Sequence, residues 1–396
     1  MAGGIMTWDE ARRQFPCTRG QAFLNTGTLG PVPDSVMRPY VASLTAWNAA
    51  GPGDPATYIG WRDRIEATRE ALGAWFSAPS TTLSFAGNVT DALNIALMGL
   101  RLPPGGRVIT SDQEHGALIA PLALLAERGV TVEIIPYGHG GDDLLGRLAT
   151  ALERPADLVA LSHVSCETGA FVDGQALAAL CHSRGALLLL DGAQTPGQIS
   201  VDLTKLGADL YAFNGHKWML APVGCAVLYV RPDIQDRVAP TFTGDGPGWS
   251  TNYPAGVESR RPADGTRFEY GTRNWPAIVA WREVLDFWSR LPAEAAYRRQ
   301  RELATVLAAR LQDIDRVELW SPHLPVGGIV TVSVAGYTAS ELFERLRDRK
   351  VIGRRVQKGA IQGVRLCTTF FNNLDDIGQA VDAVRALATL TSRASP

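Results

Sequence analysis

The feature that most limits the fold of this chain is a run of four leucines, Leu187 to Leu190, that ends in Asp191. An apolar run without polar alternation is typical of a strand that is buried on both faces, as in a mainly parallel sheet. Similar runs lie at 107–110, 131–135, 158–161 and 225–230, and segments with helical apolar spacing separate them. This alternation predicts an α/β domain in which helices cover a mostly parallel sheet.

The spacing of apolar residues also predicts the domain organisation. Helices are expected over 116–127 and 174–183, and after about residue 275 the pattern changes. Long helices are then expected over 276–288 and 293–311, followed by a Pro/Gly-rich joint at 321–328, a strand over 329–334, and helices over 339–347 and 374–390. We therefore expect a large domain, residues 26–275, and a small α+β domain, residues 276–396, on which an N-terminal segment, residues 1–25, packs.

The composition excludes several classes of function. The net charge is −2 without a long run of one sign, so a nucleic acid or an acidic membrane is not an expected partner. No apolar run reaches membrane-spanning length, and the first residues lack the basic and apolar regions of a signal peptide. Five scattered cysteines without a CxxC motif predict a reducing, cytoplasmic location with neither a disulfide framework nor a metal site.

Lys217 and Asp191 carry the strongest chemical signal. Lys217 follows an expected strand over 209–213 and is flanked by His216 and Trp218. Desolvation at such a place lowers the pKa of an amine and suits it to form a Schiff base. Asp191, at the end of a buried strand, needs a cationic or donor partner. Taken alone, Asp191 could form a salt bridge and Lys217 could contact a phosphate, but together they predict a pyridoxal phosphate (PLP) site.

Two further segments suit the same cofactor. Residues 84–91 pass from a strand through Gly87 into a helix, and the backbone amides at this helix start would form a phosphate cradle with the Thr90 hydroxyl. An ordinary helix cap is the alternative. His115 follows another strand end and would stack on the pyridine ring or relay a proton, although a hydrogen-bonded loop histidine would explain it too.

Seven short motifs are spread over nearly the whole chain: Phe23 to Thr28, Glu114-His115, Ser162 to Ser165, Asp191 to Gln194, Gly215 to Lys217, Arg267 to Thr272, and Arg365 through Asn372. In these motifs the chain resembles the class V aminotransferase group of fold-type I PLP enzymes. That group includes cysteine desulfurases, selenocysteine lyases, isopenicillin N epimerase-like proteins and cystine or cysteine-conjugate C–S lyases. The resemblance implies a large domain with a mainly parallel seven-stranded sheet, a smaller α+β C-terminal domain, and PLP as cofactor.

The resemblance also implies how the cofactor is held. Lys217 would bind it as a Schiff base, Asp191 would pair with the pyridine nitrogen, and His115 would stack on the ring, which makes these three the catalytic residues. The other expected cofactor contacts come from side chains and backbone around the pocket: Gln194 on the phenolic oxygen, and Thr90, Asn214 and His216 on the phosphate, with the backbone of Asn88 and Val89.

Substrate binding and assembly follow from the same resemblance. Arg365 would bind the α-carboxylate of an amino-acid substrate, a task that suits its bidentate fork, and Asn25 would assist. Thr272 would reach the phosphate of the neighbouring subunit's cofactor, which predicts a homodimer with a shared site. Five aromatic residues either line a roomy pocket or belong to the core: Tyr58, Trp61, Trp218, Phe242 and Trp249.

The cysteines separate this chain from the desulfurases. Desulfurases carry a mobile cysteine upstream of the carboxylate-binding arginine, but the equivalent residues here, 353–360, contain none. Cys367 falls in an expected core strand, and Cys166 stands where many relatives have asparagine near the ring oxygen, where it either alters the ring electronics or packs in the core.

Our leading hypothesis is therefore a C–S β-lyase that acts on cysteine or a cysteine S-conjugate and releases pyruvate, ammonia and a thiol. An epimerase of the isopenicillin N type, an aminotransferase, a decarboxylating enzyme and a binding module that has lost catalysis remain open at this stage, because the same Schiff base serves every one of the reactions.

Overall fold

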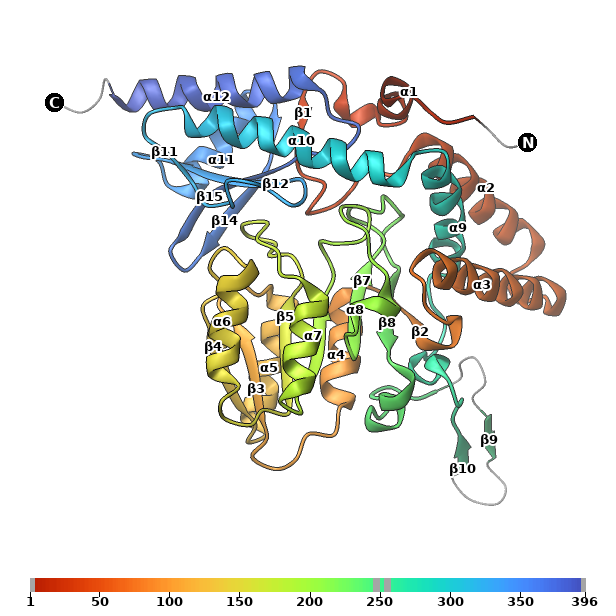
Figure 1. Cartoon of the computed structure of the whole chain (residues 1–396). Coiled ribbons are helices and arrows are strands. Elements are labelled where there is room, and N and C mark those ends of the chain that lie inside the picture. Colours follow the sequence, from red (N-terminus) through yellow and green to blue (C-terminus); the bar gives the residue numbers. More distant parts are fainter. Residues whose placement is uncertain (1–3, 245–249, 253–257, 393–396) are drawn as a thin grey trace.

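The computed structural model describes residues 4–244, 250–252 and 258–392. Figure 1 shows a large α/β body, a smaller lobe that contains the C-terminal helix, and the N-terminal segment beside that smaller lobe. Among the described residues, no helix combines the length and the apolar character that a membrane crossing requires. Trp249, one of the aromatic residues named above, lies outside the described residues.

The large domain is built on a seven-stranded sheet, as predicted. Its order is β2 (Leu83–Ala86), β8 (Ala226–Val230), β7 (Leu210–Asn214), β6 (Leu187–Asp191), β5 (Leu158–Ser162), β3 (Arg107–Ser111) and β4 (Thr131–Ile135). Strand β8 is antiparallel to both of its neighbours, whereas the other pairs are parallel. Every residue of β6 is buried, which explains its unbroken leucine run. The predicted fold class is confirmed.

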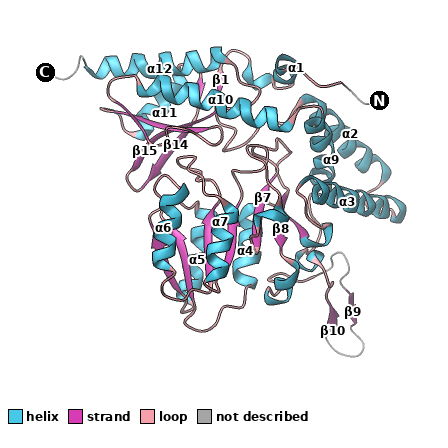
Figure 2. Cartoon of the chain, viewed as in Figure 1, coloured by secondary structure: helices cyan, strands magenta, loops and turns pink. Residues whose placement is uncertain are grey.

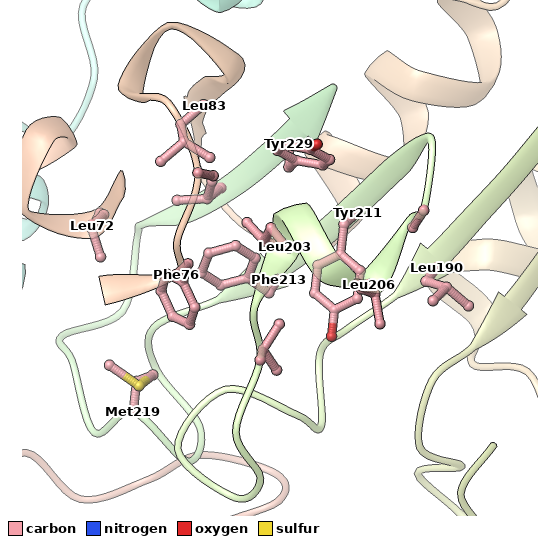
Figure 3. Close-up of a cluster of buried hydrophobic side chains, with 14 of the residues drawn as sticks. Leu72, Phe76, Leu83, Leu190, Leu203, Leu206, Tyr211, Phe213, Met219 and Tyr229 are labelled. Carbon is pink, nitrogen blue, oxygen red and sulfur yellow. The ribbon is translucent and has the colours of Figure 1, made fainter. Parts of the chain in front are cut away.

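Helices cover both faces of this sheet (Figure 2). Their bounds are α4 (Val89–Gly99), α5 (Gly116–Glu127), α6 (Gly141–Ala151), α7 (Gly174–Ser183) and α8 (Leu203–Leu206). Helices α4 and α5 share one buried apolar cluster with the sheet, and α6, α7 and α8 share another on the opposite face. Figure 3 shows part of the second cluster, in which the rings of Phe76 and Phe213 lie 4.6 Å apart.

The carboxyl ends of the parallel strands place the chemically interesting residues at one edge of the sheet. Asp191 and Asn214 are the last residues of β6 and β7, and Glu114-His115 follows the end of β3. Asn88 begins α4 directly after β2. Segments that are far apart in sequence therefore meet outside the same edge, which is where open α/β sheets bind their ligands.

The small domain contains an antiparallel sheet in the order β11 (Val317–Leu319), β12 (Ile329–Val334), β15 (Ile361–Cys367) and β14 (Arg354–Lys358). Its helices are α10 (Ala293–Gln312), α11 (Ala339–Asp348) and α12 (Leu374–Ser392). The N-terminal segment contributes α1 (Trp8–Arg13) and β1 (Ala22–Phe23), and β1 pairs in parallel with β13 (Val351–Ile352). Arg12 forms an ion pair with Asp376 at 2.7 Å, which joins this segment to α12.

Three further helices form a layer at the side of the large domain: α2 (Asp34–Ala50), α3 (Pro55–Trp75) and α9 (Trp275–Ser289). Trp281 of α9 is fully buried in the same cluster as Phe213, and a short hairpin, β9 (Ser250–Asn252) with β10 (Glu258–Arg260), precedes this helix. The division between the domains at residue 275 stays a prediction.

Candidate active site

A cavity of about 250 Å³ lies at the carboxyl edge of the large sheet, where residues of the small domain close over it. It brings together ten of the twelve predicted site residues: Asn88, Val89, Thr90, His115, Asp191, Gln194, Asn214, His216, Lys217 and Arg365. Gly27, Thr28, Ala117, Cys166, Ala193 and Arg354 complete the lining. Asn25 and Thr272, the two remaining predictions, do not line this cavity.

Lys217 is held in a tight turn directly after β7. The N–H of Leu220 donates to the Lys217 carbonyl at 3.1 Å, and the N–H of Ala221 closes the turn onto Gly215 at 2.8 Å. Leu220 is a buried, non-glycine residue with φ of 67°, a conformation that costs free energy and that often marks a functional site. Burial lowers the pKa of the Lys217 amine, and the negative charge of Asp191 opposes this shift.

Asp191 is 3% exposed and faces the same cavity. Its Oδ1 accepts the N–H of Ala193 at 2.8 Å. Burial raises the pKa of this carboxyl, while the Lys217 charge and the Ala193 N–H lower it. A cationic partner such as a protonated pyridine would stabilise the ionised form of Asp191, as the sequence argument requires.

The other end of the cavity offers groups that suit a phosphate. Asn88 is the N-cap of α4 and accepts the N–H of Asp91 at 3.0 Å, so the positive end of the helix dipole faces the cavity beside Val89 and Thr90. Asn214 Oδ1 and His216 Nδ1 are buried without a hydrogen-bond partner. Burial, and then the Lys217 charge, lowers the pKa of His216 to about 4, so its ring is neutral at pH 7.

His115 is fixed at the N-terminus of α5. Its Nδ1 accepts the N–H of Ala117 at 3.1 Å, which leaves the ring proton on Nε2. Burial first, and then the charges of Lys217 and Arg354, lowers the pKa of His115 to about 4. The ring is therefore a neutral, oriented surface in the cavity wall, consistent with stacking on an aromatic cofactor.

The N-terminal loop packs tightly against the cavity. Gln194 donates from Nε2 to the Gly27 carbonyl at 2.9 Å, and its Oε1 accepts the Trp218 indole N–H at 2.7 Å. A Cβ added to Gly27 would lie 2.9 Å from Cys367 Sγ and 3.2 Å from Arg365 Cζ, so a side chain at this position is excluded. Asn25 does not line the cavity, but its Oδ1 accepts a hydrogen bond at 2.7 Å from the hydroxyl of Thr28, which does.

Arg365 lies on β15, is 1% exposed, and projects towards the cavity. Its Nη1 donates to the Cys166 carbonyl at 2.6 Å and its Nη2 to the Thr28 hydroxyl at 2.9 Å, but its Nε is buried without a partner. A buried guanidinium with unused donor capacity is suited to bind a carboxylate.

Sequence reasoning assigned no role in the site to three charged residues around this cavity. Arg354 lies directly opposite Arg365 in the β14–β15 register and lines the cavity, and its guanidinium is 3.5 Å from the buried carboxylate of Glu167. Glu114 lies behind His115, and burial raises its pKa to about 7. The alternation of β14 places Arg354 on its inner face, but that signal is visible only once the pairing with β15 is known.

None of the described aromatic residues named above lines this cavity, and the core alternative holds for two of them. Trp61 and Trp218 are buried in the core, and Phe242 lies at the surface against Tyr270. Tyr58 lines a second cavity, of about 370 Å³, together with Thr272 and Arg273. Large aromatic side chains are as common in a core as in a pocket, so their presence near the motifs carried little information.

Comparisons with known proteins agree with this geometry. The Aminotransferase class-V family model matches residues 23–366. A probable cysteine desulfurase of Methanothermobacter thermautotrophicus is 29% identical over 331 residues, which cover 83% of this chain and 82% of that protein. The isopenicillin N epimerase of Streptomyces clavuligerus is 30% identical over 417 residues, which cover 97% of this chain and 99% of that protein.

Solved structures show the same architecture. A variant of the enzyme C-DES, with glycine covalently linked to its PLP cofactor, has a TM-score of 0.87 and 26% identity over 94% of this chain and 98% of that one. The complex of the cystine C–S lyase C-DES with its reaction product, cysteine persulfide, has the same TM-score with 25% identity over 94% of this chain and 99% of that one.

A mainly parallel sheet whose carboxyl edge joins a buried aspartate to a desolvated lysine defines the class of fold-type I PLP enzymes. With the family model matched over residues 23–366, the chain belongs to the class V aminotransferase family. Its cofactor is PLP. The residues present fit this group, because the positive end of the α4 dipole and the buried His216 Nδ1, which has no protein partner, lie at the end of the cavity where the phosphate would bind.

We predict that His115 stays neutral throughout the physiological pH range, with a pKa near 4. Its pKa is lowered on folding, so the stability that it contributes is present above the ordinary value of 6.5 and is lost as the pH falls towards about 4. Histidine NMR of the cofactor-free protein, with a His115→Gln variant for assignment, measures the titration. A midpoint near 6.5 would contradict the buried, uncharged ring.

Proposed function

We propose that this protein is a PLP-dependent C–S β-lyase that cleaves cysteine or a cysteine S-conjugate. With one water, each substrate would give one thiol, one pyruvate and one ammonium. The observation that carries the proposal is the environment of the cavity thiol. Burial, and then the charge of Glu167, raises the pKa of Cys166 to about 12, and its Sγ donates to Glu167 Oε1 at 3.3 Å. A thiol of this kind is a poor nucleophile.

The other thiol close to the site supports the same conclusion. Cys367 is fully buried on β15, where Ile329 of β12 lies opposite it. The segment that carries the mobile cysteine in desulfurases is here the paired strand β14, which presents Arg354 to the cavity. A sulfur transfer to a protein thiolate needs an accessible, activated cysteine, and neither Cys166 nor Cys367 meets that requirement.

Each of three residues of the cavity would have a separate role in the reaction. When bound, PLP would supply an electron sink for the carbanion that forms at Cα. The Lys217 amine, which burial biases towards its neutral form, would take the Cα proton. The Asp191 carboxylate would maintain the positive charge on the ring nitrogen, and Arg365 would hold the α-carboxylate through its unused donors.

Arg354 would act on the leaving sulfur. Its guanidinium lines the cavity, and it lies in register with Arg365, so a substrate held by Arg365 would have a second cation nearby. Negative charge develops on sulfur as the C–S bond breaks, and a positioned cation stabilises such charge. The name of C-DES, a cystine C–S lyase, adds support from a related fold.

An epimerase is the second candidate, because the match to isopenicillin N epimerase covers 97% of this chain and 99% of that enzyme. Epimerisation would use the same Lys217 and Asp191 but would return a proton to Cα instead of expelling a group at Cβ. The two reactions therefore differ in their products and not in the residues that begin them.

We predict that a cysteine S-conjugate gives thiol, pyruvate and ammonia in equal amounts, and that Cys367→Ser and Cys166→Ser keep most of this activity. Arg365→Ala should raise KM by about tenfold or more, since it removes a charge-assisted contact with the carboxylate. Product assays with the three variants measure these effects. Alanine with a protein persulfide would overturn the lyase assignment, and racemised substrate without pyruvate would favour the epimerase.

We further propose that the active unit is a homodimer in which Thr272 completes the partner's site. Thr272 is exposed in the single chain and lines the second cavity, beside an Arg273 whose two terminal nitrogens are buried without hydrogen-bond partners. Buried polar groups without hydrogen-bond partners indicate that a second molecule provides the missing partners.

If the site is shared, mixing inactive Lys217→Ala subunits with inactive Thr272→Val subunits should restore activity, because one of the two sites in each hybrid has both residues intact. Turnover measured after subunit exchange provides the test, and each variant mixed with itself is the control. A fully active monomer in sedimentation would contradict the shared site.

A further inference from the structure

The β14–β15 hairpin of the small domain extends towards the large domain (Figure 1), and its residues Arg354 and Arg365 line the cavity. At its tip, Lys358 Nζ donates to the backbone carbonyl of Glu114 at 2.8 Å. That carbonyl belongs to the peptide bond that leads into His115, the ring in the cavity wall. One hydrogen bond therefore connects the hairpin that carries Arg354 and Arg365 to the segment that positions His115.

The alternation of β14 shows that this contact belongs to an organised face of the strand. Arg354 and Lys358 are half-buried and Val356 is fully buried, whereas Arg355 and Gln357 between them are exposed. Residues two apart share one face of a strand. The inner face of β14 thus presents a cation to the cavity, an apolar residue to the core and a second cation to the large domain.

Glu114 offers Lys358 a fixed point of attachment. Its buried side chain accepts hydrogen bonds from the Ser111 hydroxyl at 2.5 Å and from the Ser162 N–H at 2.8 Å. These contacts tie the end of β3 to the end of β5, so the Glu114 carbonyl cannot move without disturbing two strands. An ammonium bound to such a carbonyl makes a charge-assisted contact, which is stronger than a neutral one.

Other parts of the small domain are held to the large domain by hydrogen bonds that are fully buried. The inner strand β12, which β15 separates from β14, is tied to the large domain by a buried hydrogen bond from the Thr331 hydroxyl to the Glu167 carbonyl at 2.6 Å. A second buried bond runs from the Ser321 hydroxyl to the Thr168 carbonyl at 2.5 Å. Strand β14 is one of the two edge strands of the sheet. Besides the contact of Arg354 with Glu167 at 3.5 Å, it reaches the large domain through the Lys358 hydrogen bond, which is only partly buried. Local opening is easiest where contacts are exposed, so the edge strand is the part of this interface that opens first.

We propose that Lys358 is a positioning residue, whose bond to the Glu114 carbonyl holds the β14–β15 hairpin closed and so keeps Arg354, Arg365 and His115 in place around the substrate. This deepens the proposed function, because it assigns substrate retention to a group that touches neither substrate nor cofactor. Loss of the bond would let the edge strand open, and the bound amino acid would escape more readily.

The test compares Lys358→Met, which keeps the chain length but loses the donor, with Lys358→Arg, which restores a cationic donor. Gln357→Met is the matched control, since it changes the neighbouring exposed residue on the other face. The first measurement is amide hydrogen exchange of residues 114–118 in the full-length protein, with and without PLP. The second is a titration of the PLP-loaded protein with glycine, followed by cofactor absorbance.

Lys358→Met should speed exchange at 114–118 and weaken glycine binding about tenfold or more, the scale of one charge-assisted hydrogen bond. Lys358→Arg should restore both values, and Gln357→Met should match the wild type. Equal exchange and equal glycine affinity in the Lys358→Met and Gln357→Met proteins would overturn the proposal. Glycine has no leaving group, so failure of the lyase reaction would not disturb either measurement.

Discussion

The structure of the site depends on one buried charge. Asp191 ends a strand that is buried along its whole length, and its carboxyl is 3% exposed. In the described structure only the Ala193 N–H bonds to it directly, while the Lys217 charge acts on it from across the cavity. A carboxylate in that setting is stable only opposite a cation. The position of Asp191 therefore requires a positively charged group in the cavity, and a pyridinium ring meets that requirement.

The arrangement of the other groups around the cavity follows from the position of Asp191 at the end of its strand. Parallel strands end at one edge, so the residues after β2, β3, β6 and β7 meet outside it, and a helix start opposite the aspartate provides a place for an anion. The small domain then closes the open side with a single hairpin. That hairpin carries both the guanidinium of Arg365 and the half-buried Arg354, so the proposed substrate binding and the contact between the domains would use the same element.

Much of this organisation could be predicted from the sequence, because periodicity reports burial directly. The leucine run lies in a strand, Leu187–Asp191, that is shifted by one residue from the expected 186–190, and the helices over 116–127 and 174–183 have the expected bounds. The strand β14 was missed, because its short, mostly basic sequence resembles a surface loop until β15 is known to lie beside it. Arg354, Glu167 and Lys358 were missed for the same reason. Their roles come from contacts between segments far apart in the chain, and no local pattern records those contacts.

The most direct test of the account is the identity of the residue that carries the cofactor. PLP-loaded protein should be yellow, and borohydride reduction followed by digestion should fix the cofactor mass on the peptide that contains Lys217. Asp191→Asn protein, treated in the same way, should still be labelled at Lys217 but should lose nearly all turnover, because the ring nitrogen is no longer held in its charged form. A label on Lys205 or Lys358, or full turnover without the Asp191 carboxylate, would contradict the account.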